Sequence, residues 1–361
     1  MKSWEVFDPK NPKELDYFIT QPSSIANLIN FKYLAEISSY EKRNYKIIQP
    51  IGQGGNGIVY LALCTQDKKK ATYYRGQFFA LKLFRNIRIT ERTRRFYTES
   101  LVLKKLDHPS IIKHYDSGIY LYSNQDSKNK KKYPFFITSY IPQTLFNIIS
   151  KISFLEALNF SIQLLSALSY IHSKGIIHRD IKPKNIFIHE KKAILGDFGL
   201  IKQTKEDLRF ENQEFQSDVD SLCYGQALNY RSPDIMDYIK KGIELTPKSD
   251  IIQLGLVIAE MFTKQNPQER QNYKNWDSAR DRYLSNIKWK NDPPNRCGDM
   301  PKNSVYNSEK IVSIINAMLH EKPQERPDAD TALTKFMDIF SDYAEQEIRN
   351  SSSNTNKFLD L

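Results

Sequence analysis

The sequence predicts a protein of the α+β class with two domains, and three observations lead to this prediction. Its 361 residues exceed one typical domain of roughly 100–200 residues. Segments with the pattern of β-strands gather before residue 141, and most segments with helical periodicity follow residue 150. The strand segments are Ile47–Lys82, which holds three strands, Ile111–Tyr122 and Tyr133–Tyr140. The helical segments are Thr90–Leu106, Ser153–Ser173, Ile251–Phe262, Ile311–Leu319 and Asp328–Phe340.

The charge of the chain leaves one class of partner open. Hydrophobic residues make up 40% of the sequence, which is enough for ordinary cores, and the formal net charge is +11. A basic balance allows nucleic-acid, acidic-membrane or acidic-protein partners, but general surface chemistry of a chain rich in Lys, Asn and Ile is the favoured interpretation. No nucleic-acid-binding motif is present, so nucleic acid is not an expected partner. A nucleic-acid-binding protein remains the alternative that charge alone suggests, and salt-dependent binding would reveal it.

Cysteine usage and apolar segments favour a cytoplasmic protein. The three cysteines, Cys64, Cys223 and Cys297, are odd in number and lack metal-ligand spacing, which favours a reducing compartment. The first residues, Met1–Asp8, lack the apolar core of a signal peptide. The most apolar segment, Ile251–Phe262, is too short to cross a bilayer. We therefore expect no membrane span.

The two ends of the chain are expected to lie outside the main domains. Residues 1–44 form an N-terminal extension, in which Ser23–Tyr40 has apolar residues near helical spacing. This segment is predicted to be a short amphipathic helix packed on the fold, with a docking or regulatory arm as the alternative. Residues 341–361 form a C-terminal tail that is partly disordered, because Ser351–Asn356 is a polar run.

A glycine-rich loop follows the first predicted strand. The sequence GQGGNG at 52–57 contains the spacing G-x-G-x-x-G, which alone also fits a dinucleotide-binding turn. A dinucleotide fold needs a helix directly after the glycines. Here Val59, Leu61 and Leu63 alternate with other residues, which is typical of a strand. The glycines therefore indicate a strand-turn-strand lid over phosphate groups.

Two helices have clear boundaries. Thr90–Leu106 carries Glu99 on its inner side and ends before Pro109. Ser153 and Glu156 form a capping box at the start of the next long helix, and Gly175 fits its end. His172, near that end, is interpreted as a cation that stabilises the helix terminus.

The residues that predict chemistry lie between His178 and Gly199. Asp180 and Asn185 are five residues apart on a loop, because Pro183 prevents a regular helix there. A short strand pair then leads to Asp197. The oxygen ligands of Asn185 and Asp197 suit Mg²⁺ bound together with substrate phosphates, with Mn²⁺ as an alternative. Asp180 is predicted to accept the proton of an attacking hydroxyl.

HRDIKPKN at 178–185 and DFG at 197–199 resemble the catalytic loop and DFG element of the eukaryotic-type protein kinases. Lys182, two residues after Asp180, matches the Ser/Thr-kinase form of the loop. The resemblance implies a bilobal fold, with a small antiparallel five-stranded N-lobe (45–139) that carries helix C. It also implies a larger, mainly helical C-lobe (142–340).

The resemblance also implies a role for each matched residue. Lys82 holds the phosphates of ATP and pairs with Glu99, Thr138 is the gatekeeper, and Ser139–Pro142 is the hinge. Lys182 stabilises the transferring phosphoryl group. The implied ATP-binding residues are Ile51, Gly52, Gly54, Gly55, Asn56, Gly57, Val59, Ala80, Lys82, Glu99, Thr138, Ser139, Tyr140, Ile141 and Phe187.

Three further matches concern the C-lobe. NYRSPD at 229–234 resembles the A-P-E end of an activation segment, with Asp234 in place of Glu, so its pairing with Arg326 is expected to be loose. Asp250 lies in a segment similar to D-x-W-S-L-G, without the Trp, and should bond the backbone near Arg179. Ala227 stands where Ser/Thr kinases commonly have Thr.

The activation segment carries the predicted regulation. Arg179 is expected to pair with a phosphate on this segment, or with a carboxylate such as Asp218 or Asp220. The candidate phosphorylation sites are Thr204, Ser217, Ser221 and Tyr224.

Together these matches predict an ATP-dependent serine/threonine protein kinase that acts on a protein substrate. The alternative is a pseudokinase scaffold that binds nucleotide or partners without turnover, as the departures at Ala227 and Asp234 suggest.

Overall fold

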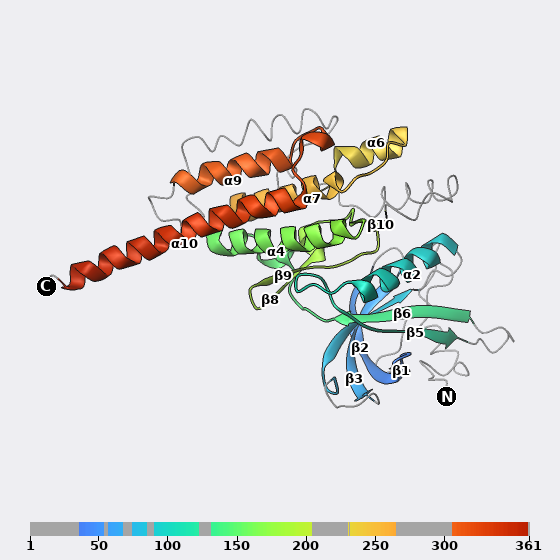
Figure 1. Cartoon of the computed structure of the whole chain (residues 1–361). Helices are drawn as coiled ribbons and strands as arrows, with labels where there is room; N and C mark the ends of the chain where they lie inside the picture. The colour runs from blue at the N-terminus through green and yellow to red at the C-terminus, as the bar shows by residue number, and fades with distance from the viewer. Residues whose placement is uncertain are drawn as a thin grey trace. The chain divides into compact units, whose positions relative to one another are not determined.

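The computed structural model describes residues 36–53, 57–67, 74–84, 90–122, 131–203, 230, 232–264 and 305–359 (Figure 1). The chain divides into two compact units. Unit 1 contains Met1–Asp107 and Ile112–Pro142, and unit 2 contains His108–Ile111 and Gln143–Leu361.

Unit 1 is built on one antiparallel sheet with strand order β1-β2-β3-β4-β6-β5. The prediction of an α+β fold with an antiparallel sheet in the N-terminal part is confirmed, but the sheet has six strands rather than five. The elements are β1 Glu36–Ser38, β2 Arg43–Gln53, β3 Gly57–Asp67, β4 Phe78–Phe84, α2 Thr90–Lys105, β5 His114–Tyr122 and β6 Lys131–Ser139.

The additional strand corrects the interpretation of Ser23–Tyr40 as a helix. Only its last residues are described, and there β1 pairs with β2, with Ile37 opposite Tyr45. Ile37 is fully buried in the sheet core while Glu36 is exposed, so the side chains alternate as a strand requires. A single apolar residue fits a strand as well as a helix, and pairing with β2 decides between them.

The turn after β1 reaches the other edge of the sheet. The Ser39 hydroxyl donates to the buried carboxylate of Asp116 in β5, and the Tyr40 N–H donates to the Ser117 carbonyl at 2.8 Å. Arg43 Nη1 lies 3.3 Å from Asp116 Oδ2. The start of the described chain is therefore anchored to β5 as well as to β2.

Unit 2 is mainly helical, and α4 lies at its centre against α7, α10 and β9 (Figure 1). Its helices are α3 Leu145–Ile148, α4 Phe154–Ser173, α6 Pro233–Lys241, α7 Lys248–Thr263, α9 Val305–Met318 and α10 Ala329–Leu359. Its short elements are β7 Ile176–Ile177, η1 Pro183–Asn185, β8 Ile186–His189, β9 Lys192–Leu195, β10 Lys202–Gln203 and η3 Pro323–Glu325. The antiparallel pairs β7–β10 and β8–β9 enclose the loop that was predicted to carry the chemistry.

Local signals set the boundaries of α4 as predicted. The Glu156 N–H donates to Ser153 Oγ at 3.2 Å, and the Ser153 N–H donates to Glu156 Oε2 at 2.8 Å. Gly175 has a φ of 71°, the left-handed conformation that glycine adopts without strain after a helix. This turn leads the chain directly into β7 and His178.

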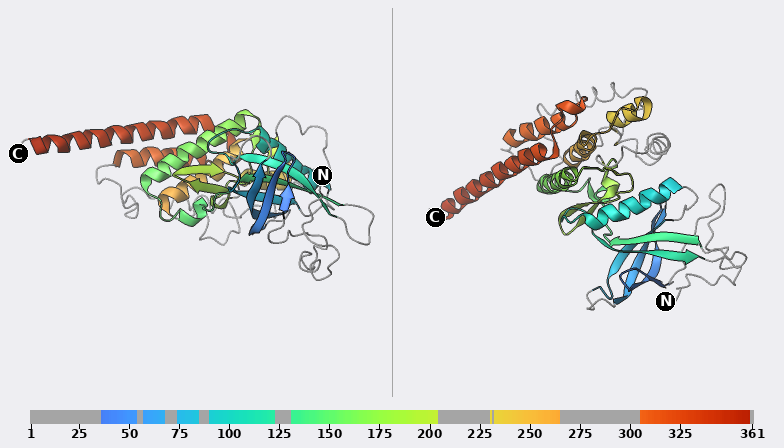
Figure 2. Two further views of the ribbon diagram at one scale, coloured as in Figure 1. Left: turned by 90° about the horizontal axis from the view of Figure 1, so that it is seen from below. Right: turned by 45° about the vertical axis from the view of Figure 1, so that its right-hand side comes forward.

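The last helix is longer than predicted. It continues to Leu359 instead of ending near Phe340, and it extends past α4 and α9 in both views of Figure 2. No glycine or proline interrupts residues 329–359. Packing also favours the extension, since the Tyr343 ring lies 5.6 Å from that of Phe154, and Lys310 Nζ lies 2.6 Å from Asp342 Oδ2. The polar run 351–356, predicted to be disordered, lies within this helix.

Among the described residues, one helix is long and apolar enough to cross a membrane by length and composition, namely α4. Its stripe of buried residues packs against α7, α10 and β9. Its apolar character is thus explained by its place in the core of unit 2.

Candidate active site

Unit 1 contributes an ion pair between a strand and a helix. Lys82 lies in β4, opposite Val59 and Phe136, and its Nζ donates to Glu99 Oε1 of α2 at 2.7 Å. The Glu99 side chain is 4% exposed and that of Lys82 is 23% exposed. The predicted contact between these residues is therefore present, with the lysine ammonium partly open to solvent.

Part of the glycine-rich loop is described. Gly57 cannot carry a side chain, because a Cβ there would lie 2.4 Å from the Leu83 carbonyl oxygen of β4. A Cβ on Gly52 would meet only Val59, at 3.8 Å. Sheet packing thus explains why position 57 is a glycine, but it does not explain the glycine at position 52. Gly54, Gly55 and Asn56 lie outside the described residues, and Ile51 is exposed at the end of β2.

The predicted gatekeeper and hinge lie at the end of β6. Thr138 is opposite Ala80 of β4, so both predicted nucleotide-binding residues lie on neighbouring strands. Ser139, Tyr140 and Ile141 follow with partly exposed side chains, and unit 1 ends at Pro142.

In unit 2, the buried carboxylate of Asp250 in α7 holds the start of the catalytic loop. Its two oxygens accept the N–H groups of His178 and Arg179, each at 2.8 Å. His172 Nε2 lies 2.9 Å from Asp250 Oδ2. His172 lies in the last turn of α4, where it was interpreted as a helix-end cation, and its ring also bonds the carboxylate that holds the loop.

Asp180 lies at the centre of the loop and is 5% exposed. Lys182 Nζ donates to both of its carboxylate oxygens, at 2.8 and 2.7 Å. Asn185 Nδ2 donates to the Asp180 carbonyl and to Asp180 Oδ2, each at 2.8 Å. Burial raises the pKa of Asp180 to about 7, although Lys182 opposes the shift. Three residues that were singled out from the sequence therefore meet at one carboxylate.

The buried His178 side chain bonds the backbone of the catalytic loop and of Gly196. It is fully buried, its Nδ1 accepts the Asp180 N–H at 3.3 Å, and its Nε2 lies 3.2 Å from the Gly196 carbonyl. Burial lowers the pKa of His178, and the bonding pattern assigns the proton of a neutral ring to Nε2. The Phe198 ring meets it edge-on at 4.7 Å, which connects the loop with the DFG element.

The donor set around Asn185 and Asp197 fits a magnesium ion bound together with phosphates. Asn185 uses its amide nitrogen to hold Asp180, which leaves the amide oxygen as the ligand atom. Asp197 is exposed, with a φ of 55°. Hard oxygen ligands of this kind suit Mg²⁺. No group of three or more His, Cys, Asp or Glu side chains with metal-binding geometry exists within the described ranges, so phosphate oxygens would have to complete the shell.

Arg179 contacts the start of the activation segment. It has a φ of 65°, its Nε donates to the Leu200 carbonyl, and its Nη2 donates to the Ile201 carbonyl at 3.3 Å. The remaining predicted residues of this segment lie outside the described residues, namely Thr204, Ser217, Asp218, Asp220, Ser221, Tyr224 and Ala227. Phe187 is described and lies on β8, bridged to Thr144.

The pair Asp234–Arg326 is tight, contrary to the expectation of a loose one. Arg326 Nη1 and Nη2 donate to the two oxygens of Asp234 at 2.6 and 2.8 Å, a bidentate geometry. Ser249 Oγ adds a bond to Asp234 Oδ2 at 3.0 Å.

Sequence reasoning missed Gln253. This side chain of α7 is 1% exposed and bonds the backbone of the catalytic loop and of Tyr230. The available signal was a single amide inside the otherwise apolar stretch 251–259. A polar group in such a helix needs a partner.

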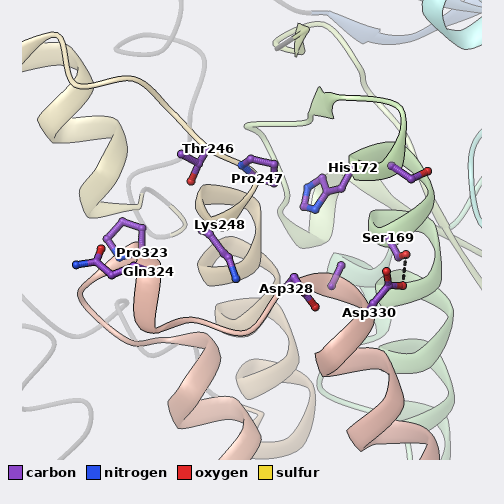
Figure 3. A pocket seen from close by; sticks show the side chains of 11 residues that line it. Ser169, His172, Thr246, Pro247, Lys248, Pro323, Gln324, Asp328 and Asp330 are labelled. Atoms are coloured by element: carbon purple, nitrogen blue, oxygen red, sulfur yellow. Dashed lines mark hydrogen bonds between the residues drawn. The ribbon is translucent and has the colours of Figure 1, made fainter. Parts of the chain in front are cut away.

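A pocket of about 550 Å³ lies between the ends of α4, α7 and α10 (Figure 3). It contains no predicted site residue, and several of its polar side chains have protein partners. Lys248 donates to the Arg326 carbonyl, Ser169 bonds Asp330, and Asp328 accepts the Thr331 N–H. We interpret this pocket as the space left between the ends of α4, α7 and α10.

A family model described as the protein kinase domain matches residues 45–337. The chain thus belongs to the protein kinase domain family, as the catalytic-loop and DFG motifs predicted. Members of this family use ATP and a divalent metal ion.

Curated relatives that resemble the chain are protein kinases. The eIF-2-alpha kinase GCN2 of Arabidopsis thaliana is 26% identical over 342 residues, which cover 82% of this chain and 25% of the relative. Nek3 of Mus musculus is 27% identical over 300 residues, covering 81% and 49%. Mitogen-activated protein kinase pmk-1 of Caenorhabditis elegans is 26% identical over 332 residues, covering 84% and 79%. The chain thus spans a quarter of the first relative and half of the second.

Proposed function

We propose that this chain is an ATP-dependent serine/threonine protein kinase. The observation that carries the proposal is the contact of Lys182 Nζ with both carboxylate oxygens of Asp180, at 2.8 and 2.7 Å. A lysine at this position is the Ser/Thr form of the catalytic loop, and here it is held beside the candidate base. The tight Asp234–Arg326 pair removes one of the two arguments for a scaffold without turnover.

In this proposal Asp180 orients the substrate hydroxyl and accepts its proton as the hydroxyl oxygen bonds to the γ-phosphorus of ATP. The bond from that phosphorus to the oxygen of ADP breaks, and ADP leaves. Lys182 neutralises charge on the transferring group, and Lys82, oriented by Glu99, does so at the nucleotide phosphates. Mg²⁺ bound by Asn185 and Asp197 would supply further neutralisation of the phosphates. The substrate is a protein, and we propose the cytoplasm as the location on the basis of the cysteine usage.

The test is transfer from radiolabelled ATP to a mixed Ser/Thr/Tyr peptide library, followed by phosphoamino-acid analysis. We expect phosphoserine or phosphothreonine, formed only with Mg²⁺ or Mn²⁺. Asp180→Asn is isosteric, and it should retain ATP binding while transfer falls about 10²–10⁴-fold, the usual contribution of a general base. Asp197→Ala should lose transfer and bind Mg·ATP more weakly.

Three results would contradict the proposal. Mainly phosphotyrosine would refute the Ser/Thr assignment. ATP binding with no transfer by the unaltered protein would favour the scaffold. Equal transfer by the unaltered protein and Asp180→Asn would show that Asp180 is not the base.

A further inference from the structure

We propose that Gln253 is a positioning residue, which fixes the catalytic loop on both sides of Asp180 and joins that loop to the backbone of Tyr230. This inference rests on the proposed kinase function. The pattern D-x-W-S-L-G has serine at this position, so the role follows from this structure and not from the family motif.

The Gln253 side chain contacts the backbone of the catalytic loop on both sides of Asp180. Gln253 Oε1 accepts the Ile181 N–H at 3.1 Å, and its Nε2 donates to the Arg179 carbonyl at 3.2 Å. Ile181 and Arg179 are the residues directly after and before Asp180. One buried amide therefore restrains the backbone on both flanks of the candidate base.

The Gln253 side chain also contacts the backbone of Tyr230. Gln253 Nε2 also donates to the Tyr230 carbonyl at 3.1 Å, and the Tyr230 hydroxyl donates to Glu260 Oε2. Gln253 and Glu260 are seven residues apart on α7 and thus lie on one face of the helix. Tyr230 precedes Ser232, the N-cap of α6, so α7 holds both the catalytic loop and the end of the activation segment.

The chemistry of the side chain explains why an amide is needed here. A glutamine has one acceptor oxygen and two N–H donors, and all three are used in these contacts. A glutamate lacks the donors, and a serine hydroxyl has a single donor for two carbonyls. Methionine has a similar length but would leave three backbone groups without this partner.

Asp250 and Gln253 have separate tasks. Asp250 binds the N–H groups of His178 and Arg179, at the start of the loop. These bonds do not involve the Gln253 side chain. We therefore expect that loss of Gln253 leaves the loop in place and reduces the accuracy with which Asp180 is oriented, so that turnover falls more than nucleotide binding.

The experiment compares Gln253→Met with a matched control, Gln163→Met. Gln163 makes the same kinds of bond, from the Ala193 N–H at 2.6 Å and to the Lys191 carbonyl at 3.3 Å, but at the β8–β9 turn. For peptide phosphorylation we expect kcat of Gln253→Met to fall at least about tenfold, equivalent to about 1.4 kcal/mol of barrier. The KM for ATP should be nearly unchanged. Gln163→Met should lose thermal stability without a comparable loss of kcat.

Hydrogen exchange of the ATP-free proteins supplies a readout that does not depend on activity. Exchange in the segment 178–185 should be faster in Gln253→Met and unchanged in Gln163→Met. If the unaltered protein proves inactive, the kinase proposal fails, and the exchange experiment still tests the restraint by Gln253.

The inference would be overturned if Gln253→Met folds and shows unchanged kcat, or unchanged exchange in the segment 178–185. It would also be overturned if the control variant loses as much kcat, because that result indicates general destabilisation.

If Gln253→Met does not fold, the test uses Gln253→Asn, which keeps the amide on a shorter side chain. Unaltered kcat in Gln253→Asn would then overturn the inference.

Discussion

Two ion pairs of this kinase domain have the same charges and opposite surroundings. In unit 1, Lys82 bonds Glu99 with 23% of the lysine side chain exposed. In unit 2, the Arg326 side chain is 0% exposed, and it bonds Asp234 twice and the carbonyls of His320, Lys248 and Glu321. All five N–H donors of the guanidinium are thus used inside the protein.

This difference in exposure indicates that the Lys82–Glu99 pair contributes mainly to the reaction and the Asp234–Arg326 pair mainly to the stability of the fold. A partly exposed ammonium can contact a phosphate while it stays bonded to its carboxylate partner. A buried guanidinium that satisfies three backbone carbonyls cannot be removed without leaving those groups unpaired. Loss of the first pair should therefore appear in activity, and loss of the second in stability.

The largest expected effect is on stability. Arg326→Leu should lower the free energy of unfolding by about 3–5 kcal/mol, because breaking a buried pair leaves an uncompensated charge. Chemical denaturation measures it. The control is Lys310→Leu, which breaks a pair whose side chains are 47% and 40% exposed, and should cost less than about 1 kcal/mol. Equal effects in the two variants would contradict the comparison.

The converse result is expected for Lys82→Met. Transfer of phosphate should fall about 100-fold or more, corresponding to about 2.7 kcal/mol of barrier. The free energy of unfolding should fall by less than the roughly 3–5 kcal/mol expected for Arg326→Leu. Lys82→Met leaves one buried carboxylate, that of Glu99, without this partner, whereas Arg326→Leu removes the partner of a carboxylate and of three carbonyls. Steady-state kinetics and denaturation on the same preparation measure both. A variant that keeps its activity but loses its stability would show that Lys82 belongs to the fold.

The pair Asp180–Lys182 lies between these extremes, because it is buried and also placed for chemistry. Burial raises the pKa of Asp180 from 3.8 to about 7. A base must be ionised, so kcat/KM, which reports the free enzyme, should rise with pH to a plateau above about 7 and fall about tenfold per pH unit well below it. The contribution of Asp180 to the free energy of unfolding changes with pH in the opposite direction. Because the folded-state pKa is raised, this contribution is fully present below pH 3.8 and is lost as the pH rises through about 7. A pH profile of kcat/KM that is flat between about pH 5 and 8 would contradict the assignment.

The smallest effect is expected for Asp234→Glu, which installs the residue of the A-P-E pattern. The bidentate contact with Arg326 is already complete at 2.6 and 2.8 Å. An additional methylene group must be accommodated, so stability should stay equal or fall by less than about 1.5 kcal/mol. A clear increase in stability would show that the natural pair is strained.

The features that sequence alone predicted well depend on short separations. Asp180, Lys182 and Asn185 meet because they are neighbours on one loop that Pro183 shapes. The capping box of α4 is likewise a local arrangement. The contact of Lys82 with Glu99 spans more chain, and it came from the family resemblance.

The features that the sequence did not reveal depend on distant partners. His172 orients Asp250 from 78 residues away, and Gln253 bonds a loop 72 residues earlier. The single amide in the apolar stretch 251–259 indicates that Gln253 needs a partner, but no local pattern identifies the partner of Gln253 or of His172. The strand β1 and the length of α10 were missed for the same reason, because pairing with β2 and packing against Phe154 decide them.

The anchored turn after β1 has a consequence for where this protein can be shortened. The recognisable domain begins at Tyr45 and ends at Met337, yet Ser39, Glu41 and Arg43 all bond the Asp116 carboxylate from outside that range. Burial already raises the pKa of Asp116, so a chain trimmed to the domain would leave a costly buried group with fewer partners and an uncovered edge on β2. Trimming at Met337 would also remove Ile339 from the core and Tyr343 from Phe154. Packing contacts thus continue beyond both ends of the stretch that similarity marks, and a shortened chain that keeps them needs residues on either side of 45–337.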